Sequence, residues 1–530
     1  MGPQNTQRSM TANFWYIGLV AMALSIGWGI RGNYGHEHGA MIPGALATLA
    51  AALLSGRADW RRRLPFFAFF GAVGWAFGGS MSYMQVIAYT HSGHSGSVLY
   101  GFASLFLIGF LWAALGGAGS AAPVFLSRVE LTELLVPLNV VFGAWLLQDL
   151  VVGVWFAVNP DFRHESVLYW YDTNWLSVLV AILAIAALAV ARRRWDWASS
   201  LILHAALGWW AGFLSLVVLL GWRMTPPRGD NWAGCVGMVA GLWVYFARRG
   251  WVGLTFSSLV TGLIGGFGFA TADLLKLVEL TSGWDANWHS VLEQTYGAIN
   301  GAGLAIAFLY LARWAPEAED SAPPNAWVGP YAVGFVLLAV TYLNLERNPG
   351  DWISAKAMPA TMYGLATQAW FGLGYLAIAA AGVGLMASHR RRPLAIMPAT
   401  AFGRGQLFFL VLLWWMVLGN FERSIPGFTQ RRLVTEGLIH LNAVLCSCGV
   451  LLGAGAVERR PTGLAMSWTR CTRETVVAGV LWITLSVLAD WGIVRGIYGD
   501  RFAGSANLHI RFGPHATATK EKPPAGQPHP

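Results

Sequence analysis

Long apolar runs recur along almost the whole chain of 530 residues. A run of about 18 or more apolar residues is the usual criterion for a helix that crosses a bilayer, because a helix satisfies its own backbone hydrogen bonds in lipid. Only 12% of the residues are charged, against roughly 25% in a soluble domain. The sequence therefore predicts an all-α, polytopic integral membrane helix bundle with about 15 transmembrane helices. The predicted spans lie near residues 12–30, 39–55, 64–84, 97–119, 132–158, 174–191, 197–221, 231–247, 251–272, 290–312, 327–345, 363–387, 406–420, 434–456 and 474–494.

The stretches between these runs are short, which leaves no room for a separate soluble domain. We expect a cytoplasmic N-terminus at 1–11, a first transmembrane repeat at 12–195 and a second at 196–387. Further transmembrane helices follow at 388–495, and an extracytoplasmic tail at 496–530. The polar, proline-rich end of that tail is expected to be disordered.

Arginine clusters occur in every second loop between the spans, for example at 57–63, 192–194 and 390–392. Such residues accumulate in loops that stay in the cytoplasm. This pattern predicts insertion in the cytoplasmic (plasma) membrane, with the N-terminus inside and the C-terminus outside. The net charge of +9 is spread over these clusters, so we expect the lipid bilayer, and no nucleic acid, as a partner. The inner arginines are expected to be simple topology anchors with few partners.

A polar turn that joins arginine to glycine recurs at the end of three apolar runs. The turns begin at Arg31, Arg228 and Arg495. After the first two, the small residues of 39–44 resemble those of 236–241 in spacing. We interpret this as an internal parallel repeat, as found in several transporter folds. The alternative is that glycine-rich helices resemble one another by composition alone.

The first of these turns is the strongest local signal for a binding site. An arginine at the mouth of a span is costly unless it is paired or hydrated. We expect the glycines to break the helix here, so that Arg31 and the amides of the next helix attract an anionic group. Glu37 would offset that charge or accept a proton. The alternative is that Arg31 and Glu37 form a structural ion pair. The predicted site residues of this turn are Arg31, Asn33, His36, Glu37 and His38.

Further site residues are expected at the other turns and inside one span. In the 290–312 run, Glu293, Tyr296 and Asn300 are spaced to share one helix face. Polar groups inside a span usually face the bundle interior and mark a pathway or relay. Buried hydrogen bonds that fix helix packing are the alternative. The additional predicted substrate-binding residues are Arg228, Asp230, Asn231, Glu293, Asn300 and Arg495.

Four histidines, His36, His38, His91 and His94, lie in two neighbouring outer loops. Imidazole suits zinc, copper or nickel, but the spacings are not those of a zinc protease motif. We therefore predict no metal and no cofactor at these residues.

The function predicted from these patterns is a secondary permease for a small polar or anionic solute. No phosphate-binding loop, dinucleotide fingerprint or nucleophile elbow is found in the sequence, which argues against ATP-driven work. The alternative is a membrane-embedded enzyme with an extracytoplasmic active site for a lipid-linked or glycan substrate. The apparent duplication favours transport, and the polar residues concentrated on one face favour the enzyme. A third hypothesis is a structural or sensory subunit that binds a partner protein through its outer loops.

Overall fold

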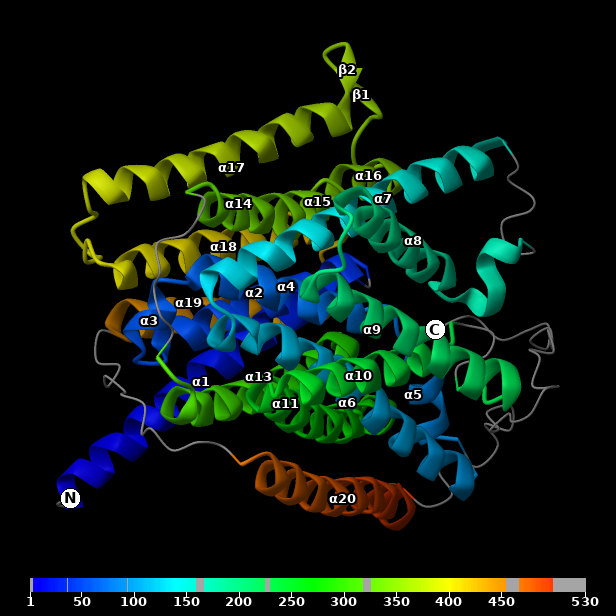
Figure 1. The fold of residues 1–530 in the computed structure, drawn as a ribbon. Helices are drawn as coiled ribbons and strands as arrows, with labels where there is room; N and C mark the ends of the chain where they lie inside the picture. Colours follow the sequence, from blue (N-terminus) through cyan, green and yellow to red (C-terminus); the bar gives the residue numbers. More distant parts are fainter. Residues whose placement is uncertain are drawn as a thin grey trace.

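A computed structural model describes residues 3–35, 37–92, 94–158, 166–224, 229–317, 326–453 and 467–498. Within these ranges the chain is almost entirely helical, apart from one antiparallel pair of two-residue strands (Figure 1). Thirteen helices of the described ranges are long and apolar enough to cross a membrane. The prediction of an all-α, polytopic membrane bundle is confirmed.

Fifteen helical segments correspond to the fifteen predicted spans. They are α1 (Pro3–Arg31), α2 (Glu37–Leu54), α4 (Leu64–Gly78), α6 (Ser95–Phe125), α7 (Arg128–Val158), α8 (Trp175–Arg192), α9 (Trp197–Phe213), α10 (Asn231–Arg249), α11 (Val252–Ala272), α13 (Trp288–Trp314), α14 (Val328–Phe335), α17 (Thr367–Arg391), α18 (Ala401–Ser424), α19 (Gln430–Leu452) and α20 (Trp468–Ile493). Two of them, α4 and α10, do not meet the length and hydropathy criteria for a span.

The remaining elements are short and connect or extend these helices. The short α-helices are α3 (Ala58–Arg61), α5 (Met84–Thr90), α12 (Leu274–Ser282), α15 (Leu343–Leu345) and α16 (Asn348–Ser354). The 3₁₀ segments are Val167–Asp172 and Ile425–Gly427, and the π segments are Leu214–Leu219, Val336–Tyr342 and Val494–Tyr498. The strands are β1 (Thr361–Met362) and β2 (Leu365–Ala366).

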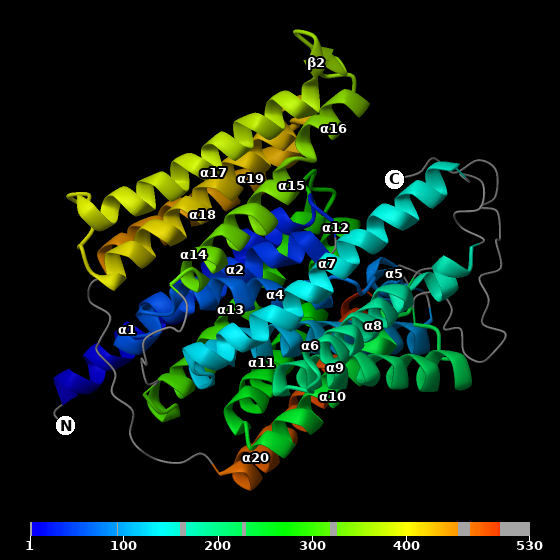
Figure 2. The ribbon, with the colours of Figure 1, turned by 45° about the horizontal axis from the view of Figure 1, so that its top comes forward.

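The helices run side by side, so that the bundle has two ends (Figure 2). At one end α1 finishes at Arg31 and α13 begins at Trp288. We call this the Arg31 end. The other end lies beyond the last residue of α2, and there the side chain of Arg57 donates hydrogen bonds to carbonyl groups at the end of α13. We call this the Arg57 end.

Close backbone contacts hold the central helices together. A Cβ atom on Gly297 of α13 would lie 2.8 Å from Cα of Ser25 in α1, and one on Gly301 would lie 2.7 Å from Cα of Ala21. Glycine at these positions therefore lets α1 and α13 approach closely, as small residues do in membrane helix pairs.

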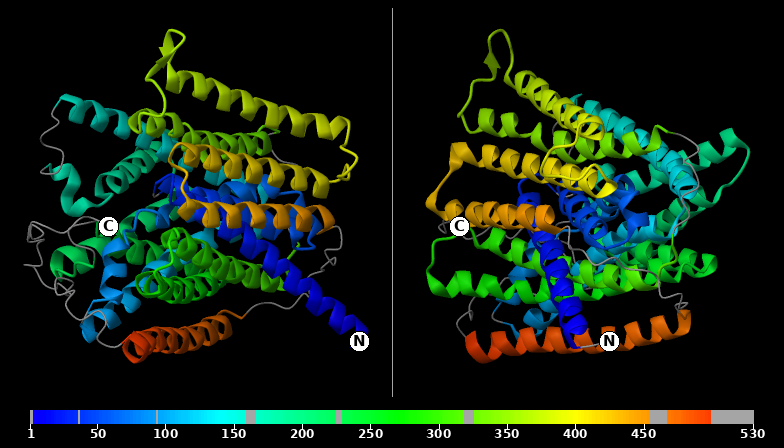
Figure 3. Two further views of the ribbon diagram at one scale, coloured as in Figure 1. Left: turned by 180° about the vertical axis from the view of Figure 1, so that it is seen from behind. Right: turned by 90° about the vertical axis from the view of Figure 1, so that its left-hand side faces the viewer.

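Helices α17 and α20 lie at opposite edges of the bundle (Figure 3). Their surfaces carry exposed large apolar side chains, among them Leu373 and Leu376 on α17 and Val480 and Leu481 on α20. Such continuous apolar surface is costly in water and suits contact with lipid. The exposed surfaces of α17 and α20 are therefore suited to face a bilayer.

The packing does not confirm the internal repeat. Helix α2 packs along α4, where a Cβ on Gly44 would lie 2.5 Å from the carbonyl oxygen of Gly71. Its predicted counterpart α10 instead packs closely along α9, where a Cβ on Gly237 would lie 1.9 Å from the carbonyl oxygen of Gly208. The repeat remains a prediction from the sequence.

Candidate functional site

The first arginine turn closes helix α1 at the Arg31 end. The amide of Asn33 donates to the carbonyl of Ile30 at 3.1 Å, and that of Tyr34 donates to the carbonyl of Arg31 at 3.0 Å. Gly35 then adopts a φ of +87°, a conformation that glycine reaches without steric cost. The predicted helix break is confirmed, and it places the side chain of Arg31 inside the bundle with only 3% of the residue exposed.

Arg31 forms a buried ion pair with Glu293, near the start of α13. The Nη1 atom of Arg31 lies 2.9 Å from Oε1 of Glu293 and donates to the hydroxyl of Tyr83 at 2.9 Å. Tyr83 in turn donates to the same carboxylate oxygen at 2.7 Å. His289, one helical turn before Glu293, has Nε2 at 3.5 Å from this oxygen. Among the described residues, Glu293 therefore has three polar side-chain neighbours, Arg31, Tyr83 and His289.

Aromatic rings enclose the guanidinium group of Arg31. Its Cζ atom lies 4.7 Å from the ring centroid of Trp112 and 5.6 Å from that of Trp28. Cation–π attraction at such distances stabilises a desolvated guanidinium. Among the described residues, Nε of Arg31 has no hydrogen-bond partner. The guanidinium is therefore stabilised by rings and by one carboxylate while it keeps a donor free.

Tyr83 lies in the connection between α4 and α5, outside the candidate membrane spans. Burial and the neighbouring charge of Glu293 raise the pKa of Tyr83, while Arg31 opposes this rise. The phenol therefore stays protonated at neutral pH. It can donate to Glu293 and leave the negative charge on the carboxylate.

Other residues of the turn reach the helices α18 and α19. The Nδ2 atom of Asn33 donates to Oδ1 of Asn420 at 2.7 Å, and Asn420 donates to Oε2 of Glu436 at 2.9 Å. Arg347 donates to the carbonyl of Tyr34. These hydrogen bonds fix the turn to segments more than 300 positions later in the sequence. They do not involve the side chain of Arg31.

Glu37 and His38 begin α2 and have partners of their own. Oε1 of Glu37 accepts a hydrogen bond from Nδ2 of Asn174 at 3.0 Å. The ring of His38 lies 3.5 Å from Nη2 of Arg347. The alternative of an Arg31–Glu37 ion pair is wrong, because Arg31 pairs with Glu293 and Glu37 turns toward Asn174.

The second turn lies close to the first. Asp230 is fully buried and pairs with Arg223, and it also accepts from the amide of Met224 at 3.1 Å. Burial raises the pKa of Asp230, although Arg223 opposes this. The next residue, Asn231, accepts from the amide of Asn174 at 2.9 Å. Asn174 thus joins the predicted site residues Glu37 and Asn231.

The remaining predicted site residues lie elsewhere. Asn300 is buried two turns along α13, where its Nδ2 donates to the hydroxyl of Tyr296 at 2.9 Å. Arg495 is exposed on the π segment after α20, so it does not join Arg31 in the bundle interior. Arg228 and His36 lie outside the described residues. Of the two predicted site arginines that the structure describes, Arg31 is therefore buried and Arg495 is exposed.

Sequence reasoning did not single out Tyr83, Trp112 or Asn420. A signal for Tyr83 exists, because Gly79, Ser80 and Ser82 interrupt the apolar run of 64–84, which we took to be one span. Asn420 is a polar residue at the end of another apolar run. No local pattern distinguishes Trp112 from the other 27 tryptophans.

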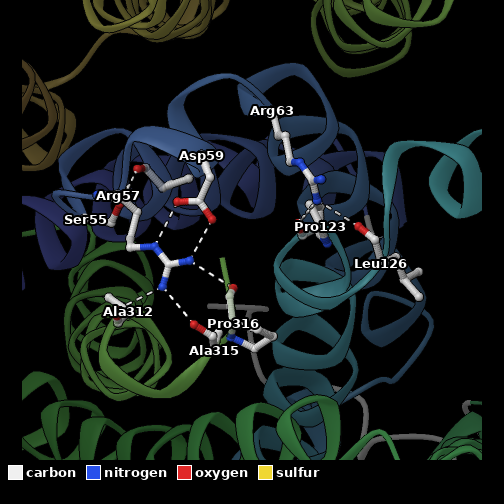
Figure 4. Close-up of polar contacts among 10 residues, drawn as sticks. Ser55, Arg57, Asp59, Arg63, Pro123, Leu126, Ala312, Ala315 and Pro316 are labelled. Carbon is white, nitrogen blue, oxygen red and sulfur yellow. Dashed lines mark hydrogen bonds and ion pairs between the residues drawn. The ribbon is translucent and has the colours of Figure 1, made fainter. Parts of the chain in front are cut away.

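The arginines of the Arg57 end are not simple anchors (Figure 4). Arg57 donates two hydrogen bonds to the carboxylate of Asp59, from Nε at 2.8 Å and from Nη2 at 2.6 Å. Its Nη1 donates to the carbonyls of Ala312 and Ala315 at 3.1 and 2.9 Å. Arg63 donates to the carbonyl of Leu126 at 2.9 Å. The expectation of few partners is wrong here, because both guanidinium groups cap the C-terminal ends of long helices, where the helix dipole favours a cation.

No group of three or more histidine, cysteine, aspartate or glutamate side chains in the described ranges could hold a metal ion. Comparison of the chain with protein-family models, with curated proteins and with solved structures found no match. The chemistry of the Arg31 site is therefore the basis for a functional proposal.

Proposed function

We propose that the protein is a secondary permease for a small anionic solute, and that the solute binds Arg31 in place of Glu293. One observation carries this proposal. A buried guanidinium at a helix break is held by a carboxylate and a phenol, both of which are side-chain groups, and its Nε has no partner in the described part of the chain. A carboxylate or phosphate group of a solute offers the planar or multidentate oxygens that suit such a guanidinium.

The exchange requires a proton to keep the buried charge balanced. When the solute anion takes over Arg31, Glu293 loses its counter-ion, and a buried carboxylate without a partner is far more stable in its neutral form. We therefore propose that Glu293 gains one proton for each anion bound. His289 lies 3.5 Å from Glu293, and its side chain is 40% exposed, which makes it the group through which that proton reaches Glu293.

The orientation belongs to the same proposal. The arginine clusters between the predicted spans support an orientation in which the Arg57 end lies in the cytoplasm. The Arg31 end would then face the extracytoplasmic side of the plasma membrane, and the solute would enter the site from there.

Uptake by purified protein in sealed lipid vesicles tests this function. We expect the wild-type chain to take up radiolabelled small carboxylates or phosphates in a saturable manner that a proton gradient stimulates. The Arg31→Gln variant should lose at least tenfold of that uptake, because the amide carries no charge to attract the anion. Circular dichroism and vesicle incorporation serve as controls for folding. Wild-type rates of uptake by Arg31→Gln would exclude Arg31 as the anion site.

A second function, an enzyme for a lipid-linked substrate, is favoured by a groove between α17 and α18. The groove has a volume of about 1070 Å³ and is lined mainly by apolar side chains such as Trp370, Ile378 and Trp414. At one of its sides Oε2 of Glu422 accepts from the hydroxyl of Tyr375 at 3.0 Å. Such a groove suits an acyl or prenyl chain whose polar head meets Glu422. Turnover of a lipid-linked sugar in detergent, lost in Glu422→Gln and accompanied by no flux in vesicles, would favour the enzyme over the permease.

A further inference from the structure

A second buried carboxyl group lies at the same end of the bundle, where α11 gives way to α12. Asp273 occupies this junction and is only 1% exposed. Neither of its carboxylate oxygens has a hydrogen-bond partner among the described residues. An ionised carboxylate in such surroundings is strongly disfavoured, and in practice the group takes up a proton or is matched by a cation.

The nearby donors and cations are engaged with other groups. The side chain of Thr90, on α5, interacts with Asp273, but its hydroxyl donates to the carbonyl of Ile87 at 2.7 Å. Lys276, on α12, attracts Asp273 electrostatically, but it pairs with Glu279 at 2.5 Å. His289, on α13, interacts electrostatically with Asp273, but its Nε2 is directed to Glu293 at 3.5 Å. No positive side chain of the described residues therefore forms an ion pair with Asp273.

Helix α20 brings a third carboxyl group into this region. Asp490 is 2% exposed, and the hydroxyl of Thr271 lies 3.5 Å from its Oδ2. Helix α20 packs along α11, where the rings of Phe267 and Trp482 contact edge to face with centroids 5.3 Å apart. This packing holds Asp490 within electrostatic range of Asp273. Two negative charges close together in a poorly hydrated site are costly, so the protonated form of at least one of the two carboxyl groups is favoured.

We propose that Asp273, with Asp490 as its neighbour, is a proton-binding site of this protein. The bound species is a single proton, which converts the carboxylate of Asp273 into the neutral acid. A metal ion is the weaker candidate, because the described residues supply no group of three or more histidine, cysteine, aspartate or glutamate side chains that could coordinate one.

The site also supplies the coupling proton of the proposed permease, and this part of the inference rests on that proposed function. His289 interacts electrostatically with Asp273 and lies 3.5 Å from Glu293. The neutral acid of Asp273 gives its proton to the imidazole of His289, and the resulting imidazolium gives it to the carboxylate of Glu293 as the anion binds Arg31. Asp273 is then re-protonated from the solvent on the side of the partly exposed Lys276.

Infrared spectroscopy of the full-length protein in lipid tests proton binding without any solute. We expect a band of a protonated carboxyl group that persists at neutral pH, where exposed carboxyl groups are ionised, and that shifts in heavy water. Asp273→Asn should lose this band, because the amide has no acidic proton. Asp490→Asn should weaken it at neutral pH, because the neighbouring negative charge that favours the protonated form is gone. The matched control is Asp285→Asn, which removes an exposed carboxylate at the same end.

The outcomes separate the proton site from the permease. An unchanged band in Asp273→Asn would overturn the proton site, whatever the transport result. A band that falls as sodium concentration rises at constant pH would overturn it in favour of a cation site. If the Asp273→Asn variant loses the band and still takes up the anion, but a proton gradient no longer stimulates that uptake, both proposals are supported. Loss of the band in a protein that never transports an anion would leave the proton site standing and exclude the permease.

Discussion

The protein buries an arginine at each end of its bundle, and the two arginines are held in different ways. Arg57 directs hydrogen bonds from Nε, Nη1 and Nη2 to Asp59 and to backbone carbonyls of Ala312, Ala315 and Pro316. Arg31 directs hydrogen bonds to one carboxylate and one phenol, packs against Trp112, and leaves Nε without a partner in the described residues.

The difference separates a structural arginine from an adjustable one. Backbone carbonyls at the end of α13 cannot titrate, and they can move away from Arg57 only if the helix itself moves. The carboxyl group of Glu293 can change both its rotamer and its charge. A ligand can therefore replace the partner of Arg31 at moderate cost, whereas replacing the partners of Arg57 means disrupting the fold.

The largest expected effect is the loss of stability in Arg57→Ala. Removal of one member of a buried ion pair typically costs about 3–5 kcal/mol, because the other charge is left without compensation. Here the carbonyls of Ala312 and Ala315 also lose their donor. Thermal unfolding of the purified protein, followed by tryptophan fluorescence, measures the effect. The neighbouring Arg62→Ala is the control, since Arg62 is exposed. Equal unfolding temperatures for the two variants would contradict a structural role of Arg57.

The next effect concerns the coupling of transport to protons. In Glu293→Gln the side chain keeps its shape but has no negative charge, so the solute anion no longer competes with a carboxylate for Arg31. We expect exchange of labelled for unlabelled solute at a rate at least equal to wild type, and no accumulation against a gradient. Counterflow and concentrative uptake in the same vesicles measure the two activities. Proton-driven accumulation by Glu293→Gln would show that another group carries the coupling proton.

A smaller effect is expected when the position of Glu293 is changed without altering its chemistry. A Cβ atom on Gly32 would lie 2.6 Å from Oε2 of Glu293, so Gly32→Ala displaces the carboxylate. We expect solute binding to strengthen by roughly 1 kcal/mol, which is about fivefold in affinity, because the displaced carboxylate competes less well with the solute anion for Arg31.

Gly18→Ala is the matched control for this variant, because nothing lies within 4 Å of a Cβ at that position of α1. Binding of a labelled anion to the detergent-solubilised protein measures both affinities. The same affinity in Gly32→Ala and Gly18→Ala would mean that the carboxylate position does not matter for solute binding.

The extent to which the sequence predicts the molecule differs between fold and site. The thirteen candidate spans of the described residues follow from apolar runs, because burial in lipid acts on each segment separately. The break after Arg31 follows from local glycines. The site additionally depends on contacts between distant segments. Arg31 and Glu293 were each predicted to belong to it, yet their pairing across 262 positions depends on the packing of α1 on α13.

The recurring turns differ in their surroundings. Similar residues in Arg495-Gly496 and in Arg31-Gly32 predict similar roles only if the flanking helices pack alike. The π segment Val494–Tyr498 follows a peripheral helix, and Arg495 is exposed there, whereas Arg31 ends a central helix. The number of neighbouring helices, which no local pattern encodes, decides whether such an arginine is buried.

The smallest expected effect belongs to Arg495, and it sharpens the distinction between buried and exposed arginines. An exposed guanidinium is hydrated, and surface substitutions usually change stability by no more than about 0.5 kcal/mol. Arg495→Gln should therefore unfold at the wild-type temperature and take up the solute at the wild-type rate, while Arg31→Gln in the same vesicles loses uptake. A large loss of uptake in Arg495→Gln would show that the last turn approaches the Arg31 site during transport, and that burial in this structure is not what distinguishes the functional arginine.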